Sequence, residues 1–288
     1  KLFEHCNNKS EHYNVKNDSS YLQGDLRNMR VTLNEASISV KGSLCKYFYG
    51  NNIDTLNLTN TREALNQISA DLSIDIHKAS VSRIDFSTNI ITDYTPTIYY
   101  PYLGQLSRFE RYEQPNSIYY NQQAKRLLFY DKIEEAKNKG MTIPKQHIGD
   151  NLLRYELVLN KGISRYLKYN GLYALDLGSE ELFKKLLHLW YSYYQQIQKH
   201  SKKLNPMEDK IINPSTFKNE MYNALVRKNP DEFYKMVAEL KAKKKFKHPE
   251  YYSRINAEIR KIQKTQVVDN ELMDELNKKI EGIYLELI

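Results

Sequence analysis

The sequence predicts an α+β fold, in which an antiparallel sheet with flanking helices is followed by a helical C-terminal region. Short segments with strand-like alternation recur between Met29 and Lys161, and helical patterns lie among them. Past that part, only helical patterns with long charged faces remain. We therefore expect a loose polar lead-in at 1–29, an α+β domain at 30–200 and a helical region at 201–288.

Strands are expected where apolar side chains occupy every second position, because alternate side chains of a strand point to one face. The clearest is 81–91, where Ile84 and Ile90 share a face opposite a row of polar residues. Residues 152–161 form a second strong strand, and the apolar run at 126–130 predicts a third. Shorter strands and turns are expected at 31–41, 98–112 and 117–121.

Two helices are predicted among the strands of the α+β domain. Residues 60–73 carry apolar side chains on one helical face, with Thr59 or Thr61 as the capping residue. Residues 131–140 start a second helix directly after a strand, and Gly140 is expected to stop it.

Longer helices are predicted toward the C-terminus. One runs from Glu180 to about Lys199, with Asp176 or Ser179 as its cap. The segment SKKLNPMEDKIINP at 201–214 is the best boundary in the chain. The helical stretches that follow it are expected at 215–247 and 250–286.

The composition favours a polyanionic partner. The formal net charge is +8, and 24 tyrosines offer rings that can stack on unpaired bases, although sheets also favour tyrosine. No window approaches the roughly 18 unbroken apolar residues of a membrane span, so no membrane partner is expected. Cys6 and Cys45 lie far apart without a motif, which predicts free thiols in a cytoplasmic protein. The chain begins with Lys1 rather than Met, as a trimmed chain or fragment would.

Two predicted strands repeat the pattern Arg-x-acid, as Arg83-Ile84-Asp85 and Arg154-Tyr155-Glu156. Side chains two apart lie on the same strand face, so each strand places a cation beside a carboxylate. If the strands are neighbours, Asp85 and Glu156 converge, and two carboxylates suit magnesium or manganese. Two Arg–carboxylate pairs on a solvated sheet face explain the same pattern without a metal.

The segment RLLFYDK places Tyr130 and Lys132 two residues apart at a strand-to-helix junction. A phenol with a pKa near 10 is a poor nucleophile unless its phenolate is stabilised. A nearby ammonium and a metal on the phosphate both favour attack on phosphorus. A tyrosine packed on the sheet beside a solvated lysine is the alternative interpretation, and spacing alone does not select one tyrosine among 24.

Three segments, in this order, resemble the gene II/X replication initiators of filamentous phages and their plasmid relatives. They are SRIDFS at 82–87, RLLFYDKIEE at 126–135 and LLRYELVLNKGISRYLKYNGL at 152–172. With a looser match, SVKGSLCKYFYGNN at 39–52, the resemblance covers roughly residues 39–175.

The resemblance implies an enzyme that nicks and rejoins one DNA strand at an origin to start rolling-circle replication. In that family a tyrosine attacks the phosphodiester, which forms a 5′-phosphotyrosyl link and frees a 3′-hydroxyl for priming; the reverse transfer later closes the displaced strand. A divalent metal, Mg²⁺ or Mn²⁺, is required. Tyr130 matches the nucleophile and Lys132 the lysine two residues beyond it, whereas Asp85 and Glu156 match acidic positions that we assign to metal binding.

The resemblance also implies partners and a location. The partners are single-stranded or supercoiled DNA at a replication origin and possible host helicase and polymerase, in the cytoplasm of a bacterial host. We expect basic side chains to hold the phosphates beside the nick, namely Arg83, Arg154, Lys161, Arg165 and Lys168. If helical, residues 165 and 168 face one side. A run of five lysines within 241–247 is expected either to grip duplex DNA or merely to keep a helix soluble.

Several alternatives stay open at this point. Many nickases hold their metal with a His-hydrophobic-His pair that this sequence lacks, so His77 is the one histidine worth testing. Conjugative relaxases share the Arg-x-acid strands, so these motifs do not separate replication from mobilisation. A repressor or packaging factor would need the charge but not Tyr130, and a hydrolytic nuclease would activate water and leave no covalent intermediate.

Overall fold

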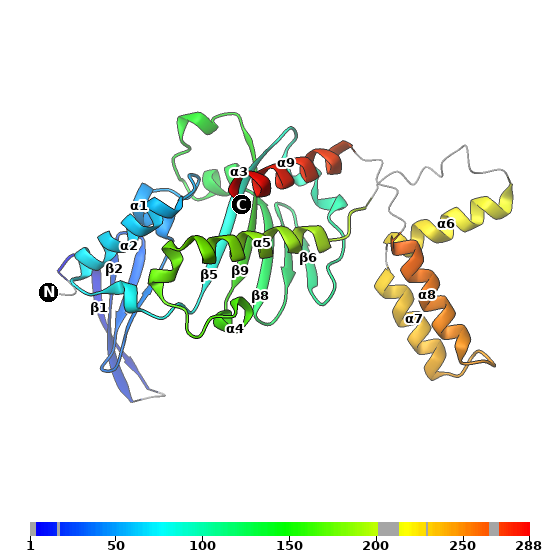
Figure 1. Ribbon diagram of the computed structural model, residues 1–288, viewed down its shortest axis with the longest axis horizontal. Helices are drawn as coiled ribbons and strands as arrows, with labels where there is room; N and C mark the ends of the chain where they lie inside the picture. The colour runs from blue at the N-terminus through cyan, green and yellow to red at the C-terminus, as the bar shows by residue number, and fades with distance from the viewer. Residues whose placement is uncertain (1–3, 16–17, 201–212, 229, 265–270) are drawn as a thin grey trace.

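The computed structural model describes residues 4–15, 18–200, 213–228, 230–264 and 271–288. It contains an antiparallel sheet of four strands, another of five strands, and helices packed on both, which confirms the α+β class (Figure 1). Within these ranges every helix is too short or too polar to span a lipid bilayer. Cys6 and Cys45 are free thiols, as predicted.

The five-stranded sheet carries the segments that the sequence singles out. Its order is β5-β9-β8-β7-β6, and all neighbours are antiparallel. The strands are β5 (Ile84–Thr92), β6 (Glu110–Gln114), β7 (Ser117–Asn121), β8 (Lys125–Asp131) and β9 (Asn151–Leu159). The two Arg-x-acid segments therefore lie on neighbouring strands, because β5 pairs with β9 along its whole length.

One face of this sheet is buried by helices α5 (Glu180–Gln196) and α9 (Glu271–Leu287), which lie across it in Figure 1. Phe129 and Tyr155 stack there with ring centroids 4.2 Å apart, and the Tyr155 hydroxyl donates to the Trp190 carbonyl. Each such aromatic pair stabilises the fold by about 0.5–1.5 kcal/mol beyond burial. Ser179 caps α5 by accepting from the Leu182 N–H, so the second of the two predicted caps is the one used.

Two shorter helices flank the other parts of the domain. α3 (Lys132–Asn138) follows β8 without a loop, and Gly140 after it has a φ of +61°, which confirms the predicted stop. α2 (Leu58–Leu72) confirms the other helix but not its caps. Asn57 is the cap, because its side chain accepts from the Asn60 N–H, whereas the Thr61 hydroxyl donates back to the Asn57 carbonyl.

The N-terminal segment differs from the loose lead-in that its polarity predicts. Residues 7–14 and 19–26 form β1 (Asn7–Asn14) and β2 (Ser19–Leu26), which extend a sheet with β3 (Met29–Leu33) and β4 (Ile38–Lys41). β1 is almost wholly exposed, so its order comes from main-chain pairing with β2 rather than from an apolar face. α1 (Leu44–Tyr49) and α2 cover the buried side of this sheet.

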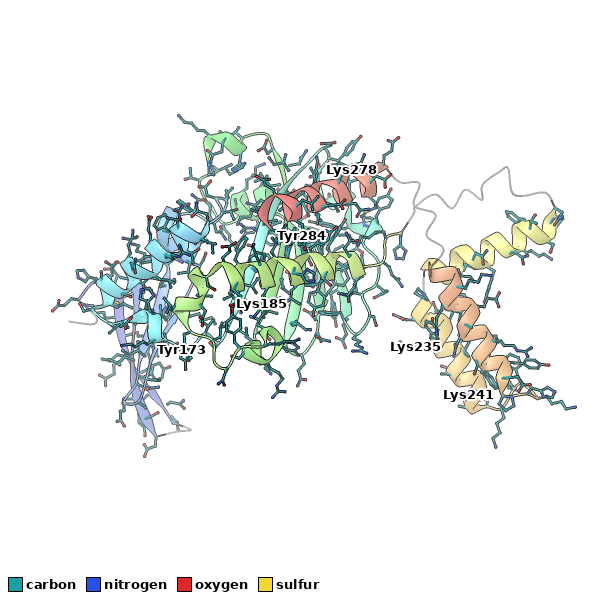
Figure 2. All side chains as sticks on the ribbon, in the orientation of Figure 1. Tyr173, Lys185, Lys235, Lys241, Lys278 and Tyr284 are labelled. Atoms are coloured by element: carbon teal, nitrogen blue, oxygen red, sulfur yellow. The ribbon has the colours of Figure 1, made fainter. Side chains whose placement is uncertain are left out.

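The C-terminal region is helical, as predicted, but it divides into two parts. α6 (Pro214–Lys228), α7 (Pro230–Ala242) and α8 (Glu250–Lys264) share a small core of their own. α9 instead joins the α+β domain, where Glu275 accepts from the Asp93 N–H and Tyr284 stacks on Tyr191 of α5 (Figure 2 labels Tyr284). The predicted boundary at 201–214 lies almost entirely outside the described residues.

Short elements complete the chain. They are α4 (Ile163–Leu167) and the 3₁₀ turns η1 (Ile76–Lys78), η2 (Pro96–Ile98), η3 (Tyr100–Tyr102), η4 (Lys145–His147) and η5 (Ala174–Gly178).

Candidate active site

The second face of the five-stranded sheet is polar, and strand register decides which side chains meet on it. Asn89 of β5 and Tyr130 of β8 both lie directly opposite Arg154 of β9. Glu156 is opposite Ser87, two residues further along. Because residues two apart share a face, this register gathers the predicted tyrosine and both carboxylates on one surface.

Tyr130 is half-buried, and its hydroxyl donates to Glu156 Oε1 at 2.8 Å. Burial, followed by the negative charge of Glu156, raises the pKa of this phenol well above its ordinary value. The hydrogen bond fixes the direction of the Tyr130 oxygen, but phenolate formation needs additional positive charge at the site.

Arg154, on the same strand as Glu156, supports the Tyr130–Glu156 hydrogen bond. Its side chain is only 5% exposed, its Nε donates to Asn89 Oδ1 at 2.8 Å, and its guanidinium lies 4.0 Å from Glu156 Oε1. The sequence predicts a DNA contact for Arg154, whereas the buried, internally bonded guanidinium is arranged to hold Glu156 and Asn89. Asn89 was not predicted as a site residue, although the polar alternation of its strand already placed it on this face.

Asp85 and Arg83 form a surface ion pair at the other end of the polar row. The guanidinium bonds both carboxylate oxygens, at 2.7 and 2.8 Å, and each side chain is 43% exposed. The hydrogen bond to Asp85 raises the pKa of Arg83, and the charge of Glu156 adds to this shift. Arg83 therefore lies within the electrostatic field of Asp85 and Glu156. Both members of the Arg83–Asp85 ion pair are accessible to solvent and ligand.

The oxygen ligands fit a hard divalent cation whose remaining coordination positions are filled by water and substrate. Asp85, Ser87 and Glu156 present oxygen atoms on one face of adjacent strands. Across the described ranges, no cluster of three or more His, Cys, Asp or Glu side chains is arranged to enclose a metal. Magnesium commonly uses one or two carboxylates together with water and substrate phosphate, so the exposed Asp85 and the half-buried Glu156 suit it in number and type.

Lys132 lies close to Tyr130, but it is fully buried rather than exposed to substrate. Its Nζ donates to Asn52 Oδ1 at 2.8 Å, pairs with Glu135 and lies 5.9 Å from the centre of the Tyr130 ring. Burial lowers the pKa of Lys132 to about 8. Asn52 ends the looser family-like segment at 39–52 but was not predicted as a site residue, because the loop that carries it reaches Lys132 only through the tertiary fold.

The buried amine predicts a pH-dependent contribution to stability. The pKa of Lys132 is about 8 in the folded chain and 10.5 in a solvated one, so between these values the unfolded chain binds more protons. The free energy of unfolding therefore rises with pH across that window, by about 2 kcal/mol between pH 7.5 and pH 9.5. Lys132→Met abolishes this rise. Urea unfolding of both proteins at pH 7.5 and 9.5 measures it, and an equal difference at the two pH values contradicts the prediction.

The remaining predicted residues lie away from Tyr130. Lys161 follows the C-terminal end of β9. It is seven residues from Arg154, which is about 23 Å along an extended chain. Arg165 lies in α4 and Lys168 ends that helix with a φ of 57°, so the two do not continue one helical face. All three are exposed. Their contact with DNA stays a prediction, at a distance from the tyrosine.

His77 makes a local contact. Its Nε2 lies 2.9 Å from Asn66 Oδ1 in the turn before β5. Among the described residues, His77 belongs to no group of three or more His, Cys, Asp or Glu side chains that could hold a metal ion, so a metal role for it gains no support.

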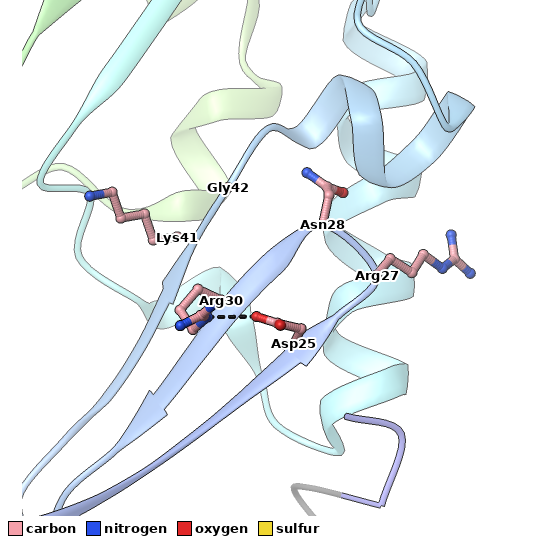
Figure 3. Close-up of a pocket in the computed structure, with 6 residues that line it drawn as sticks. All are labelled: Asp25, Arg27, Asn28, Arg30, Lys41 and Gly42. Atoms are coloured by element: carbon pink, nitrogen blue, oxygen red, sulfur yellow. Dashed lines mark hydrogen bonds and ion pairs between the residues drawn. The ribbon is translucent and has the colours of Figure 1, made fainter. Parts of the chain in front are cut away.

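A hollow of about 570 Å³ lies in the four-stranded sheet, apart from the polar face that carries Tyr130. It is lined by Asp25, Arg27, Asn28, Arg30, Lys41 and Gly42 (Figure 3). Arg30 is paired with Asp25, and Arg27 lies over the Tyr47 ring at 4.5 Å. Two of its three cations, Arg27 and Arg30, are thus occupied within the chain.

Comparison with known proteins assigns most of the chain to one family. The profile of the Phage CRI family, which describes the N-terminal part of a replication-associated protein, matches residues 5–196, about two thirds of the chain. The match spans both sheets and α5, including Tyr130, Asp85 and Glu156. No curated protein and no solved structure is significantly similar. The chain belongs to the Phage CRI family of replication-associated proteins and carries the domain typical of their N-terminal part.

Proposed function

We propose that this replication-associated protein nicks and rejoins one DNA strand at an origin, with Tyr130 as the nucleophile. The observation that carries the proposal is the hydrogen bond from Tyr130 to Glu156 on the polar face of the sheet. Family membership favours initiation of replication over mobilisation, which the strand motifs alone leave open.

The reaction exchanges one ester for another. Tyr130 Oη attacks the scissile phosphorus as the bond from phosphorus to the 3′-oxygen breaks. The phenol loses its proton and the departing 3′-oxygen gains one, so the products are a 5′-phosphotyrosyl link and a 3′-hydroxyl. The reverse exchange, from a later 3′-hydroxyl, closes the strand without an external energy source.

Each residue of the polar face has a role in this proposal. Glu156 orients the phenol oxygen, and Arg154 with Asn89 holds Glu156 in place. Asp85 and Glu156 would hold Mg²⁺ or Mn²⁺, which supplies positive charge to the phosphate when bound. Asp85 would then release Arg83, whose exposed guanidinium can contact a phosphate oxygen.

A covalent-adduct experiment tests the reaction. Single-stranded oligonucleotides from the origin region, labelled at the 3′ end, are incubated with the protein and manganese and run on a denaturing gel. The labelled fragment is expected to migrate with the protein, because the link forms on its 5′ phosphate. Cleavage without an adduct would indicate a hydrolytic nuclease, and binding without cleavage would indicate a DNA-binding protein.

The lysines between α7 and α8 are expected to add grip on duplex DNA without taking part in the chemistry. Lys241 lies in the last turn of α7 (Figure 2), and the run that it begins is exposed: Lys241, Lys243, Lys244, Lys245 and Lys247. Removing one lysine–phosphate interaction lowers the salt slope of duplex binding by about 0.9. Replacing all five by Gln should flatten the slope by up to about 4.5 and leave oligonucleotide cleavage unchanged. An unaltered salt slope would show that the five lysines do not contact DNA phosphates and only keep this part of the chain soluble.

A further inference from the structure

The polar sheet face continues beyond the candidate active site into a shallow groove of about 300 Å³ over β6, β7 and β8. Five side chains line this groove, Tyr112, Gln114, Tyr119, Asn121 and Arg126. None of them has a role in the proposed reaction. We call it the Tyr112–Arg126 groove.

Two tyrosine rings form one side of the groove. Tyr112 and Tyr119 are directly opposite each other on β6 and β7, so both point to the polar face. Tyr112 is 58% exposed, and Tyr119 is half-buried. An aromatic ring left open to solvent on a sheet face offers a flat surface on which an unpaired base can stack.

Arg126 supplies a positive charge that the described part of the chain leaves uncompensated. Its guanidinium lies 5.9 Å from the centre of the Tyr119 ring. Its Nε is buried and, among the described residues, has no hydrogen-bond partner. A buried donor without a partner is destabilising, so an anionic ligand that reaches it would remove that cost.

The groove lies on the same face as the nucleophile. Arg126 and Tyr130 are four residues apart on β8, so both side chains point to the polar face about 13 Å from each other. That distance equals about four nucleotides of stacked strand, or fewer if the strand is extended. Gln114 and Asn121 add amide groups that can bond the edges of a base.

We propose that the Tyr112–Arg126 groove binds an unpaired nucleotide beside the nick, with the base on the tyrosines and a phosphate on Arg126. The inference rests on the proposed function, because it assumes that a single DNA strand crosses this face. Duplex DNA is not expected to bind the groove, since its stacked, paired bases present no free ring face to Tyr112.

Binding measurements test the groove without relying on the reaction. All variants are made in the Tyr130→Phe protein, and the probe is a fluorescent 12-nucleotide oligothymidine. Tyr112→Leu is expected to raise the Kd about 5- to 150-fold, because one base loses its stacking partner. Arg126→Gln is expected to lower the salt slope by about 0.7. Tyr94→Leu is the matched control, since Tyr94 is 53% exposed outside the groove, and its Kd should not change.

Two further readouts separate the possible outcomes. Photocrosslinking with an iodouracil oligonucleotide should label a peptide that contains Tyr112 or Tyr119, and duplex affinity should be equal in all variants. An unchanged Kd in folded Tyr112→Leu, or an equal loss with Tyr94→Leu, overturns the groove even if the wild type forms its covalent adduct. If the wild type forms no adduct but Tyr112→Leu weakens binding, the groove stands and the proposed reaction fails.

Discussion

Tyr130→Phe is expected to abolish both DNA cleavage and the covalent adduct, while DNA affinity changes by less than about twofold. The ring and its packing remain, and only the nucleophilic oxygen is removed. Glu156 loses a hydrogen-bond donor, which costs about 1 kcal/mol and leaves the fold intact. The adduct gel and an anisotropy titration with the same oligonucleotide measure the two effects.

Neighbouring tyrosines provide the controls for this result. Tyr120 is fully buried and its hydroxyl donates to the Gly104 carbonyl, so it does not reach DNA. Tyr119 faces the same side as Tyr130 but has no carboxylate opposite it, because its β8 partner is Leu128. Tyr119→Phe should therefore retain the adduct. An adduct that survives Tyr130→Phe and disappears with Tyr119→Phe would show that the nucleophile is misassigned.

The second large effect is expected at the two carboxylates. Asp85→Ala and Glu156→Ala should each reduce the rate of metal-dependent cleavage by about 100-fold or more, because charge developing on the phosphate loses its stabilisation. Binding should change much less. A titration of cleavage rate against manganese separates weaker metal binding from slower chemistry.

The structure makes different predictions for the stability of these two variants. Asp85 pairs with Arg83 on the surface, so its loss should change the free energy of unfolding by at most about 1 kcal/mol. Loss of Glu156 leaves Tyr130 and the buried Arg154 with fewer partners and should cost about 1–3 kcal/mol. Glu156→Gln is the matched variant, since it keeps an acceptor for Tyr130 without the charge. A folded double variant that nicks at the wild-type rate would rule out the metal site.

Local sequence patterns determined the main strands and most helix positions. The alternation at 81–91 is strong because one face of β5 is buried against α5 and α9, whereas 152–161 is rich in apolar residues because β9 is buried along almost its whole length. The same alternation placed Asp85 and Glu156 each on a polar face. It failed at β1, because a strand held by main-chain pairing with β2 needs no apolar side chains.

The sequence by itself determined the residue types of the candidate site and the family to which they point. Only the tertiary structure decided how they meet, since strand register brings Tyr130 opposite Arg154 and against Glu156, and sequence spacing does not contain register. The fold also buried Lys132 and returned α9 to the first domain. These outcomes depend on contacts between segments far apart in the chain, which no local pattern encodes.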